Sequence, residues 1–216
     1  TGDKIAGTRI IPLVIEEEKM QKACEVAGKE PIFRILPYQK KKAGIVTTGS
    51  EVYYHRIEDK FTPVVIDKLK ECGVTEVKQI RCNDDHEMIT EAIQTLIEDG
   101  SDLIVCTGGM SVDPDDRTPL AIKNACTEVV TYGAPVLPGA MFMLAYCEKE
   151  GRQIPVMGLP GCVMYAKRTI FDLVLPRIMC DEKLHEKDFR LLGQGGLCLS
   201  CPVCTFPNCG FGKGGY

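Results

Sequence analysis

The sequence predicts an α/β protein in which helices cover both faces of a mostly parallel sheet, a three-layer α/β/α sandwich. Short apolar runs alternate along the chain with stretches whose apolar residues recur at helical spacing, and this alternation is typical of a parallel sheet. Three of these runs, at residues 43–46, 102–106 and 154–157, each end in a glycine turn. Because the carboxyl ends of parallel strands meet along one edge, we expect the three turns to surround a crevice there.

The N-terminal appendage, residues 1–40, does not follow this pattern. We expect short strands at residues 4–5 and 9–15. Apolar residues then recur at helical spacing from Met20 to Ala27, and Gly28 supplies a stop signal. A run of lysines marks the boundary with the main domain, which we place at residues 43–180.

The main domain is predicted element by element from its apolar spacing. Helical stripes at residues 61–69 and 89–97 end at Gly73 and Gly100, and the acidic Asn83-Asp84-Asp85 offers caps for the second helix. A third helix is expected from Pro119 to Cys126, with the proline in its first turn. The remaining elements are strands at residues 77–81, 103–106, 141–146 and 154–157, and a last helix from residue 166 to about residue 176.

Composition excludes several classes of protein. Apolar residues make up 44% of the chain and charged residues 26%, which is ordinary for a globular protein. The formal net charge of −4 argues against a general nucleic-acid or membrane-surface binder. No apolar stretch reaches the length that spans a membrane, and no signal peptide is recognisable. We therefore expect no nucleic acid and no membrane among its partners.

The chain contains 12 cysteines, a high number. Several of them, such as Cys72 and Cys106, lie inside apolar runs and are expected to be small buried hydrophobes. Because the chain is not a short secreted scaffold, we expect reduced thiols and a cytoplasmic location.

The glycine turns favour a phosphorylated small molecule as ligand. Glycine allows a ligand to approach the backbone, and free N–H groups at a helix start attract an anion. Each turn taken alone is equally well explained as a tight connection between a strand and a helix. The turns read Thr47-Thr48-Gly49-Ser50-Glu51, Thr107-Gly108-Gly109-Met110-Ser111 and Gly158-Leu159-Pro160-Gly161-Cys162.

Taken together, these turns resemble the molybdopterin-binding domain of molybdenum cofactor biosynthesis. The resemblance covers residues 43–180. Beside the turns, its matching stretches are Asn83-Asp84-Asp85 before a helix, Asp116-Arg117-Thr118-Pro119 and Pro138-Gly139. Two branches share this domain, the molybdopterin adenylyltransferases and the molybdopterin molybdotransferases. Pro138-Gly139 and Leu159-Pro160-Gly161 favour the molybdotransferase branch.

The resemblance implies a set of functional residues. Asp84 and Asp116 are implied to be catalytic, and paired carboxylates beside a phosphate suit Mg²⁺. The alternatives are a helix cap for Asp84 and a turn carboxylate for Asp116. The backbone N–H groups of the second turn are expected to hold the phosphate, so that Gly109→Val blocks the ligand without unfolding the protein. The residues implied to bind molybdopterin are Thr48, Gly49, Ser50, Glu51, Thr107, Gly108, Gly109, Ser111, Thr118, Pro160 and Gly161.

Three departures from the molybdotransferase pattern leave the activity open. Ala140 stands where that branch has lysine, Cys162 stands where it has asparagine, and Asp59-Lys60-Phe61 replaces aspartate–serine–asparagine. We therefore keep three functions: a molybdotransferase, a non-catalytic carrier or sensor of the cofactor, and an adenylyltransferase. The implied partners are molybdopterin or its adenylylated form, a molybdoenzyme, and further copies of the chain in a homo-oligomer.

The C-terminal tail, residues 193–216, carries a separate signal. Cys198-x₂-Cys201-x₂-Cys204-x₄-Cys209 places four thiols within twelve residues, which indicates a metal site. The spacing is near that of bacterial ferredoxins, although the last gap is one residue longer and no second motif follows. An iron–sulfur cluster and Zn²⁺ both fit four thiolates, and an unliganded or disulfide-bonded tail is the remaining alternative.

Overall fold

The computed structural model describes residues 6–7, 9, 11–31 and 33–214, and the chain divides into two units, Thr1–Leu36 and Pro37–Tyr216. In the first unit, α1 (Glu17–Ala27) ends at Gly28, which confirms the predicted helix. The strand expected at residues 9–15 is absent from the described part of that segment. A strand needs a neighbour to complete its hydrogen bonds, and these residues pair with no described strand. Residues 4–5 lie outside the described residues.

The second unit is built on one six-stranded sheet with the order β2-β1-β3-β6-β5-β4. The pairs β1–β2, β1–β3 and β3–β6 are parallel, whereas β5 runs antiparallel to both β6 and β4. The predicted mostly parallel sheet is therefore confirmed. The strands are β1 (Lys42–Thr48), β2 (Glu76–Cys82), β3 (Leu103–Thr107), β4 (Glu128–Tyr132), β5 (Met143–Lys149) and β6 (Arg152–Leu159).

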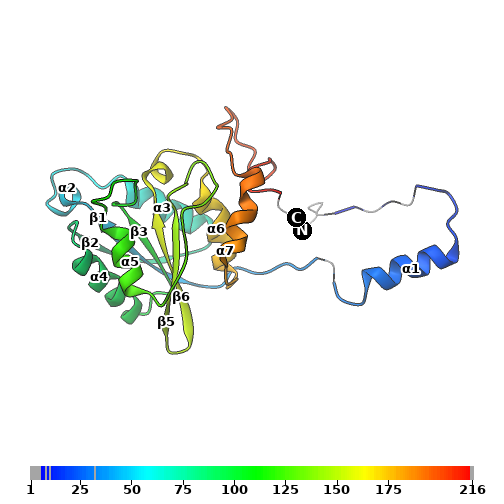
Figure 1. Cartoon of the computed structure of the whole chain (residues 1–216), viewed down its shortest axis with the longest axis horizontal. Helices are drawn as coiled ribbons and strands as arrows, with labels where there is room; N and C mark the ends of the chain where they lie inside the picture. The colour runs from blue at the N-terminus through cyan, green and yellow to red at the C-terminus, as the bar shows by residue number, and fades with distance from the viewer. Residues whose placement is uncertain (1–5, 8, 10, 32, 215–216) are drawn as a thin grey trace. The chain divides into compact units, whose positions relative to one another are not determined.

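Helices cover both faces of this sheet, which confirms the three-layer sandwich (Figure 1). One face packs against α4 and α5, and the other against α3, α6 and α7. The helices of the unit are α2 (Ser50–Tyr53), α3 (Phe61–Glu71), α4 (His86–Glu98), α5 (Thr118–Ala125), α6 (Ile170–Met179) and α7 (Glu186–Leu191), with short 3₁₀ turns η1 (Gly161–Met164) and η2 (Leu192–Gly195).

The alternation of side chains along the central strands explains the two cores. In β1, Ile45 faces the α3 and α6 side while Val46 faces the α4 side, and both are fully buried. Successive side chains of a strand point to opposite faces, so a strand covered on both sides is apolar throughout. This is why residues 43–46 and 103–106 read as continuous apolar runs.

Four elements of this unit differ from the sequence prediction. The last helix begins at Ile170 and continues through Pro176 to Met179, because burial of Ile178 and Met179 outweighs the loss of the backbone hydrogen bond that proline cannot donate. Strand β4 was not predicted, although its β-branched residues Val129 to Thr131 are a strand signal. The short helices α2 and α7 were also not predicted.

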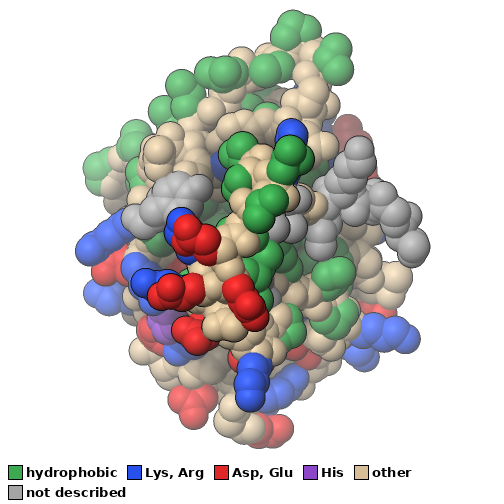
Figure 2. All heavy atoms as spheres, turned by 90° about the vertical axis from the view of Figure 1, so that its right-hand side faces the viewer, with side chains coloured by type: hydrophobic (Ala, Val, Ile, Leu, Met, Phe, Trp, Pro, Cys, Tyr) green, Lys and Arg blue, Asp and Glu red, His purple; other side chains and the backbone are tan. Residues whose placement is uncertain are grey.

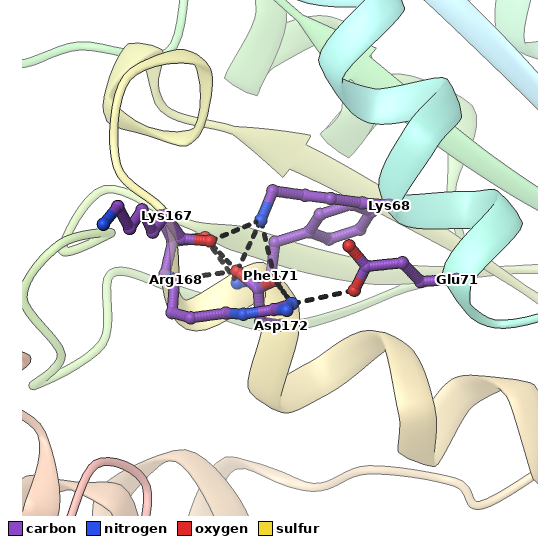
Figure 3. A network of polar contacts seen from close by, with 7 residues as sticks. Lys68, Glu71, Lys167, Arg168, Phe171 and Asp172 are labelled. Carbon is purple, nitrogen blue, oxygen red and sulfur yellow. Dashed lines mark hydrogen bonds and ion pairs between the residues drawn. The ribbon is translucent and has the colours of Figure 1, made fainter. Parts of the chain in front are cut away.

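A buried ion pair joins α3 to α6 (Figure 3). Lys68 Nζ lies 2.7 Å and 2.9 Å from the two carboxylate oxygens of Asp172. Asp172 also accepts hydrogen bonds from Arg168 Nη1 at 2.8 Å and from the Thr169 backbone N–H at 2.7 Å, and it closes the capping box of α6. The network fixes the segment between η1 and α6, which lies beside the site described below.

No helix within the described part of the chain is long and apolar enough to cross a membrane.

Candidate functional site

The three glycine turns follow β1, β3 and β6, which are adjacent and parallel in the sheet. The chain leaves β1 toward β2 on one side and later returns to β3 on the other. The strand order therefore reverses between β1 and β3, and a crevice at the carboxyl ends of the strands is the usual place for a ligand in such sheets.

The first and second turns pack directly against each other through Thr118. Its hydroxyl donates a hydrogen bond to the Gly108 carbonyl at 2.9 Å and lies 3.3 Å from the hydroxyl of Thr48. Gly108 has a φ of +88°, and a Cβ there would lie 2.4 Å from the Thr48 carbonyl oxygen. Gly109 has a φ of +54°, and its Cβ would lie 2.8 Å from Thr118 Oγ1. Gly109→Val would therefore strain the turn itself, and it is not the clean block of ligand binding that the sequence predicts.

Two aspartates each accept hydrogen bonds from a serine in these turns. Asp84 accepts the Ser50 N–H at 2.8 Å, and the Ser50 hydroxyl lies 2.8 Å from Asn83 Oδ1 and 3.0 Å from Asp84 Oδ2. Asp116 accepts the equivalent bonds from Ser111, at 2.5 Å and 2.8 Å. The carboxylates thus take the donors that the sequence assigns to an anionic ligand.

Asp84 does not cap α4. Asp85 is the N-cap residue, and its carboxylate accepts the Met88 backbone N–H at 2.9 Å. Asp84 therefore bonds to Ser50 of the first turn instead, although it is adjacent to Asp85 in the sequence.

A cavity of about 560 Å³ opens at the ends of β3 and β6. Its walls are residues 110–112, 137–141 and 160–162, together with Leu197 and Cys198 of the tail. Of the residues implied to bind molybdopterin, Ser111, Pro160 and Gly161 line it. Those of the first turn do not, and neither do Thr107, Gly108, Gly109 and Thr118. None of the described side chains that line this cavity is charged.

Ala140 and Cys162, two of the departures in the sequence, both lie in the wall of this cavity. Burial raises the pKa of the Cys162 thiol above its ordinary value, so at neutral pH the group is a neutral thiol. A lysine and an asparagine would have placed a positive charge and an amide here.

The hydroxyl of Thr107, at the end of β3, is the one buried side-chain oxygen or nitrogen among the described residues that has no hydrogen-bond partner. A buried hydroxyl without a partner is costly. Thr107 does not line the cavity, and its contact with a ligand stays a prediction.

The sequence prediction missed a polar network beside the first turn. Asp59 caps α3 by accepting the backbone N–H groups of Phe61 and Thr62, each at 3.0 Å, and it accepts a bond from Gln79 at 2.9 Å. Burial acts to raise the pKa of Asp59, but the hydrogen bonds from Thr62, Gln79 and Phe61 outweigh it and hold the pKa below its ordinary value. An aspartate just ahead of a helical stripe is the signal that would have found this cap.

The four tail cysteines lie together along a second cavity, which is described below. Among the described residues, no three His, Cys, Asp or Glu side chains are grouped so as to hold a metal ion. The metal predictions for the tail and for Asp84 and Asp116 therefore stay predictions.

These features define a doubly wound α/β protein with a small-molecule pocket at the carboxyl edge of its sheet. A family model described as "Probable molybdopterin binding domain" matches residues 44–179. The match covers more than half of the 216 residues, and the chain therefore belongs to the molybdopterin-binding domain family.

Individual relatives are more distant. A CinA-like protein of Mycobacterium sp. (strain MCS) is 36% identical over 85 residues, which is 39% of this chain and 20% of the relative. The chain thus spans about a fifth of the length of the curated relatives it matches.

Solved structures share the fold. The tungsten cofactor synthesizing protein MoaB from Pyrococcus furiosus aligns with a TM-score of 0.54 and 19% identity over 67% of this chain and 99% of its own. A putative molybdenum cofactor biosynthesis protein from Corynebacterium diphtheriae aligns with a TM-score of 0.53 and 14% identity over 67% of this chain and 98% of its own. At these identities the likeness concerns the fold alone.

Proposed function

We propose that this protein binds molybdopterin or its adenylylated form in the cavity at the ends of β3 and β6, in the biosynthesis or handling of molybdenum cofactor. The observation that carries the proposal is the cavity itself, about 560 Å³ in volume and placed at the crevice of a molybdopterin-binding domain. Small-molecule sites occupy roughly 300–1,000 Å³ and are mostly apolar, and the uncharged lining fits the flat pterin.

The phosphate end of the ligand belongs at the second turn. Ser111 offers an N–H and a hydroxyl there, in the wall of the cavity, and Thr107, just before the turn, has a buried hydroxyl without a partner among the described residues. A phosphate that takes the Ser111 donors displaces the Asp116 carboxylate, which is then free to hold Mg²⁺ with the phosphate oxygens. Asp84 on Ser50 has the same arrangement at the first turn.

Three functions are compatible with this site. Asp84 and Asp116 with Mg²⁺ support a molybdotransferase. A non-catalytic carrier or sensor is supported by Ala140 and Cys162 in the cavity wall, since no lysine or asparagine remains there to contact an anion. An adenylyltransferase is the third hypothesis. The cytoplasmic location, the homo-oligomer and a molybdoenzyme partner remain predictions from the sequence.

Gly161→Val is the test variant, because Gly161 lines the cavity and nothing lies within 4 Å of the Cβ that valine adds. Gly7→Val is the matched control, since Gly7 also has nothing within 4 Å and belongs to the other unit. Binding of molybdopterin, released anaerobically from a molybdoenzyme, is measured by pterin fluorescence, beside the melting temperature of each variant.

We expect Gly161→Val to weaken binding at least about tenfold, because the lost fit costs more than about 1.4 kcal/mol, at an unchanged melting temperature. Unchanged affinity in a folded Gly161→Val protein would contradict the assignment of molybdopterin to this cavity. Turnover that requires molybdate and Mg²⁺ identifies the molybdotransferase, turnover that requires ATP identifies the adenylyltransferase, and binding without either identifies the carrier.

A further inference from the structure

The four cysteines of the tail line one cavity of about 370 Å³. They are spread over twelve residues and differ in solvent exposure. Cys198 and Cys209 are half-buried, whereas Cys201 and Cys204 are exposed. Every cysteine of the sequence motif therefore lines the same cavity, and no other cysteine of the chain lines it.

The ends of this segment are tied to the main domain. The Gly212 N–H donates to the Gly195 carbonyl at 2.8 Å, which closes the segment into a loop. The first cysteine is held by a backbone bond from the Cys198 N–H to the Leu137 carbonyl at 2.8 Å, and Leu137 in turn donates to Gly196 at 2.7 Å. Phe211 is only 4% exposed and belongs to the main core.

The tip of the loop, by contrast, has little to hold it. Leu199 is 77% exposed and Val203 is 76% exposed, and hydrophobic side chains gather at the top of Figure 2, where Figure 1 shows the C-terminal loop. Burial of apolar surface therefore contributes little to ordering residues 199–204. A tip of this kind can contract around a ligand while its two ends stay in place.

Two basic residues complete the wall of the cavity. Arg168 Nη1 is held by Glu71 at 2.9 Å and by Asp172 at 2.8 Å (Figure 3), and its guanidinium lies over the ring of Phe206, 5.1 Å from the centroid. Lys167 Nζ donates to the Pro202 carbonyl of the loop at 3.4 Å. Arg168 and Lys167 thus hold Phe206 and the Pro202 carbonyl of the loop against the main domain.

We propose that Cys198, Cys201, Cys204 and Cys209 together ligate one cubane iron–sulfur cluster in this cavity. In the structure the thiols do not converge, since no described group of three such ligands is close enough to hold a metal. Ligation therefore draws the exposed Cys201 and Cys204 inward toward Cys198 and Cys209, and the binding energy orders the tip.

The pattern of the loop selects the cluster over a single zinc ion. Three cysteines at every third residue match the first three ligands of a bacterial ferredoxin run, whereas tetrathiolate zinc sites use two separated C-x₂-C pairs. Leu197 and Cys198 line both this cavity and the cavity at the ends of β3 and β6. The proposed cluster therefore lies beside the proposed molybdopterin site.

The experiment uses the full chain purified without oxygen. Iron, acid-labile sulfide and zinc are measured together with the absorption spectrum. We expect about four iron and four sulfide atoms per chain and a broad absorption at the blue end of the visible that bleaches on reduction with dithionite. The four tail thiols should resist alkylation until acid removes the cluster.

The Cys201→Ser/Cys204→Ser double variant should lose the iron, the sulfide and the colour, because both ligands are removed. Both positions are exposed, so the melting temperature of the metal-free protein should not change. Cys24→Ser is the matched control, an exposed cysteine of α1, and it should keep the full iron and sulfide content.

Stoichiometric zinc without sulfide would overturn the cluster, as would iron retained by the double variant or tail thiols that all react in the anaerobically purified protein. None of these measurements involves a pterin, so the proposal stands or fails independently of the proposed function.

Discussion

Asp172→Asn is predicted to be one of the most destabilising single changes in the main unit. The Lys68 and Asp172 side chains are only 9% and 4% exposed. The asparagine amide oxygen can still accept one bond from Lys68 Nζ, beside the Lys167 carbonyl at 3.1 Å, but the buried ammonium is left without its counter-charge. Removing one partner of a buried ion pair costs about 3–5 kcal/mol.

The expected loss of stability is large enough to measure by thermal unfolding. For a chain of 150–250 residues, 1 kcal/mol corresponds to about 2–4 °C in melting temperature, so we expect a decrease of about 6–20 °C. Circular dichroism follows the transition, and urea unfolding at 25 °C gives the free energy directly. Asp67→Asn is the control, because the Lys70–Asp67 pair is 64% and 77% exposed and such pairs contribute about 0–1 kcal/mol.

The structure also predicts an asymmetry between the two partners. After Lys68→Met, Asp172 still accepts bonds from Arg168 and from Thr169, so its charge remains compensated. Lys68→Met should therefore cost less than Asp172→Asn. The reverse order, or a cost for Asp172→Asn no larger than that of Asp67→Asn, would refute the reasoning.

Four further predictions concern the site and the thiols. Hydrogen bonds hold the pKa of Asp59 below its ordinary value. The ionised carboxylate therefore contributes its full stabilisation of the fold above about pH 4, and this contribution disappears as the pH falls through the lowered pKa. The difference in urea stability between wild type and Asp59→Asn should shrink at acid pH, and a constant difference would contradict this. Thr107→Val should keep or raise the melting temperature, since the hydroxyl has no partner among the described residues, but should weaken pterin binding; unchanged binding would exclude a ligand contact. Asp116→Asn should leave the melting temperature near that of wild type and reduce Mg²⁺-dependent binding or turnover, and a large loss of stability with unchanged function would indicate a structural role instead. Burial raises the pKa of the fully buried Cys106 thiol, so mass spectrometry after alkylation should find it unmodified in the native protein and modified only after unfolding; native labelling would show that the core opens.

The sequence by itself determined the layers of the fold and the edge of the sheet at which the candidate site is proposed. Continuous apolar runs such as residues 103–106 are required by a strand that is buried on both faces, and the glycine turns can only follow such strands at their carboxyl ends. These are local properties, set by spacing and by backbone conformation, and the parallel sheet and its helices were confirmed. The elements that were not predicted, α2, β4 and α7, bury few side chains, so burial leaves little mark on their sequence.

Only the tertiary structure decided which candidate residues meet. In the sequence, Asp84 and Asp85 are equally good candidates for the helix cap. In the structure, the connection from β2 to α4 directs Asp84 to Ser50 in the first turn and Asp85 to the N-terminus of α4. The cavity wall combines residues 110–112, 137–141 and 160–162 with Cys198, and no local pattern relates segments so far apart. Distances between elements depend on how strands order themselves in the sheet and how loops pack over its edge, and side-chain packing across the whole unit sets both.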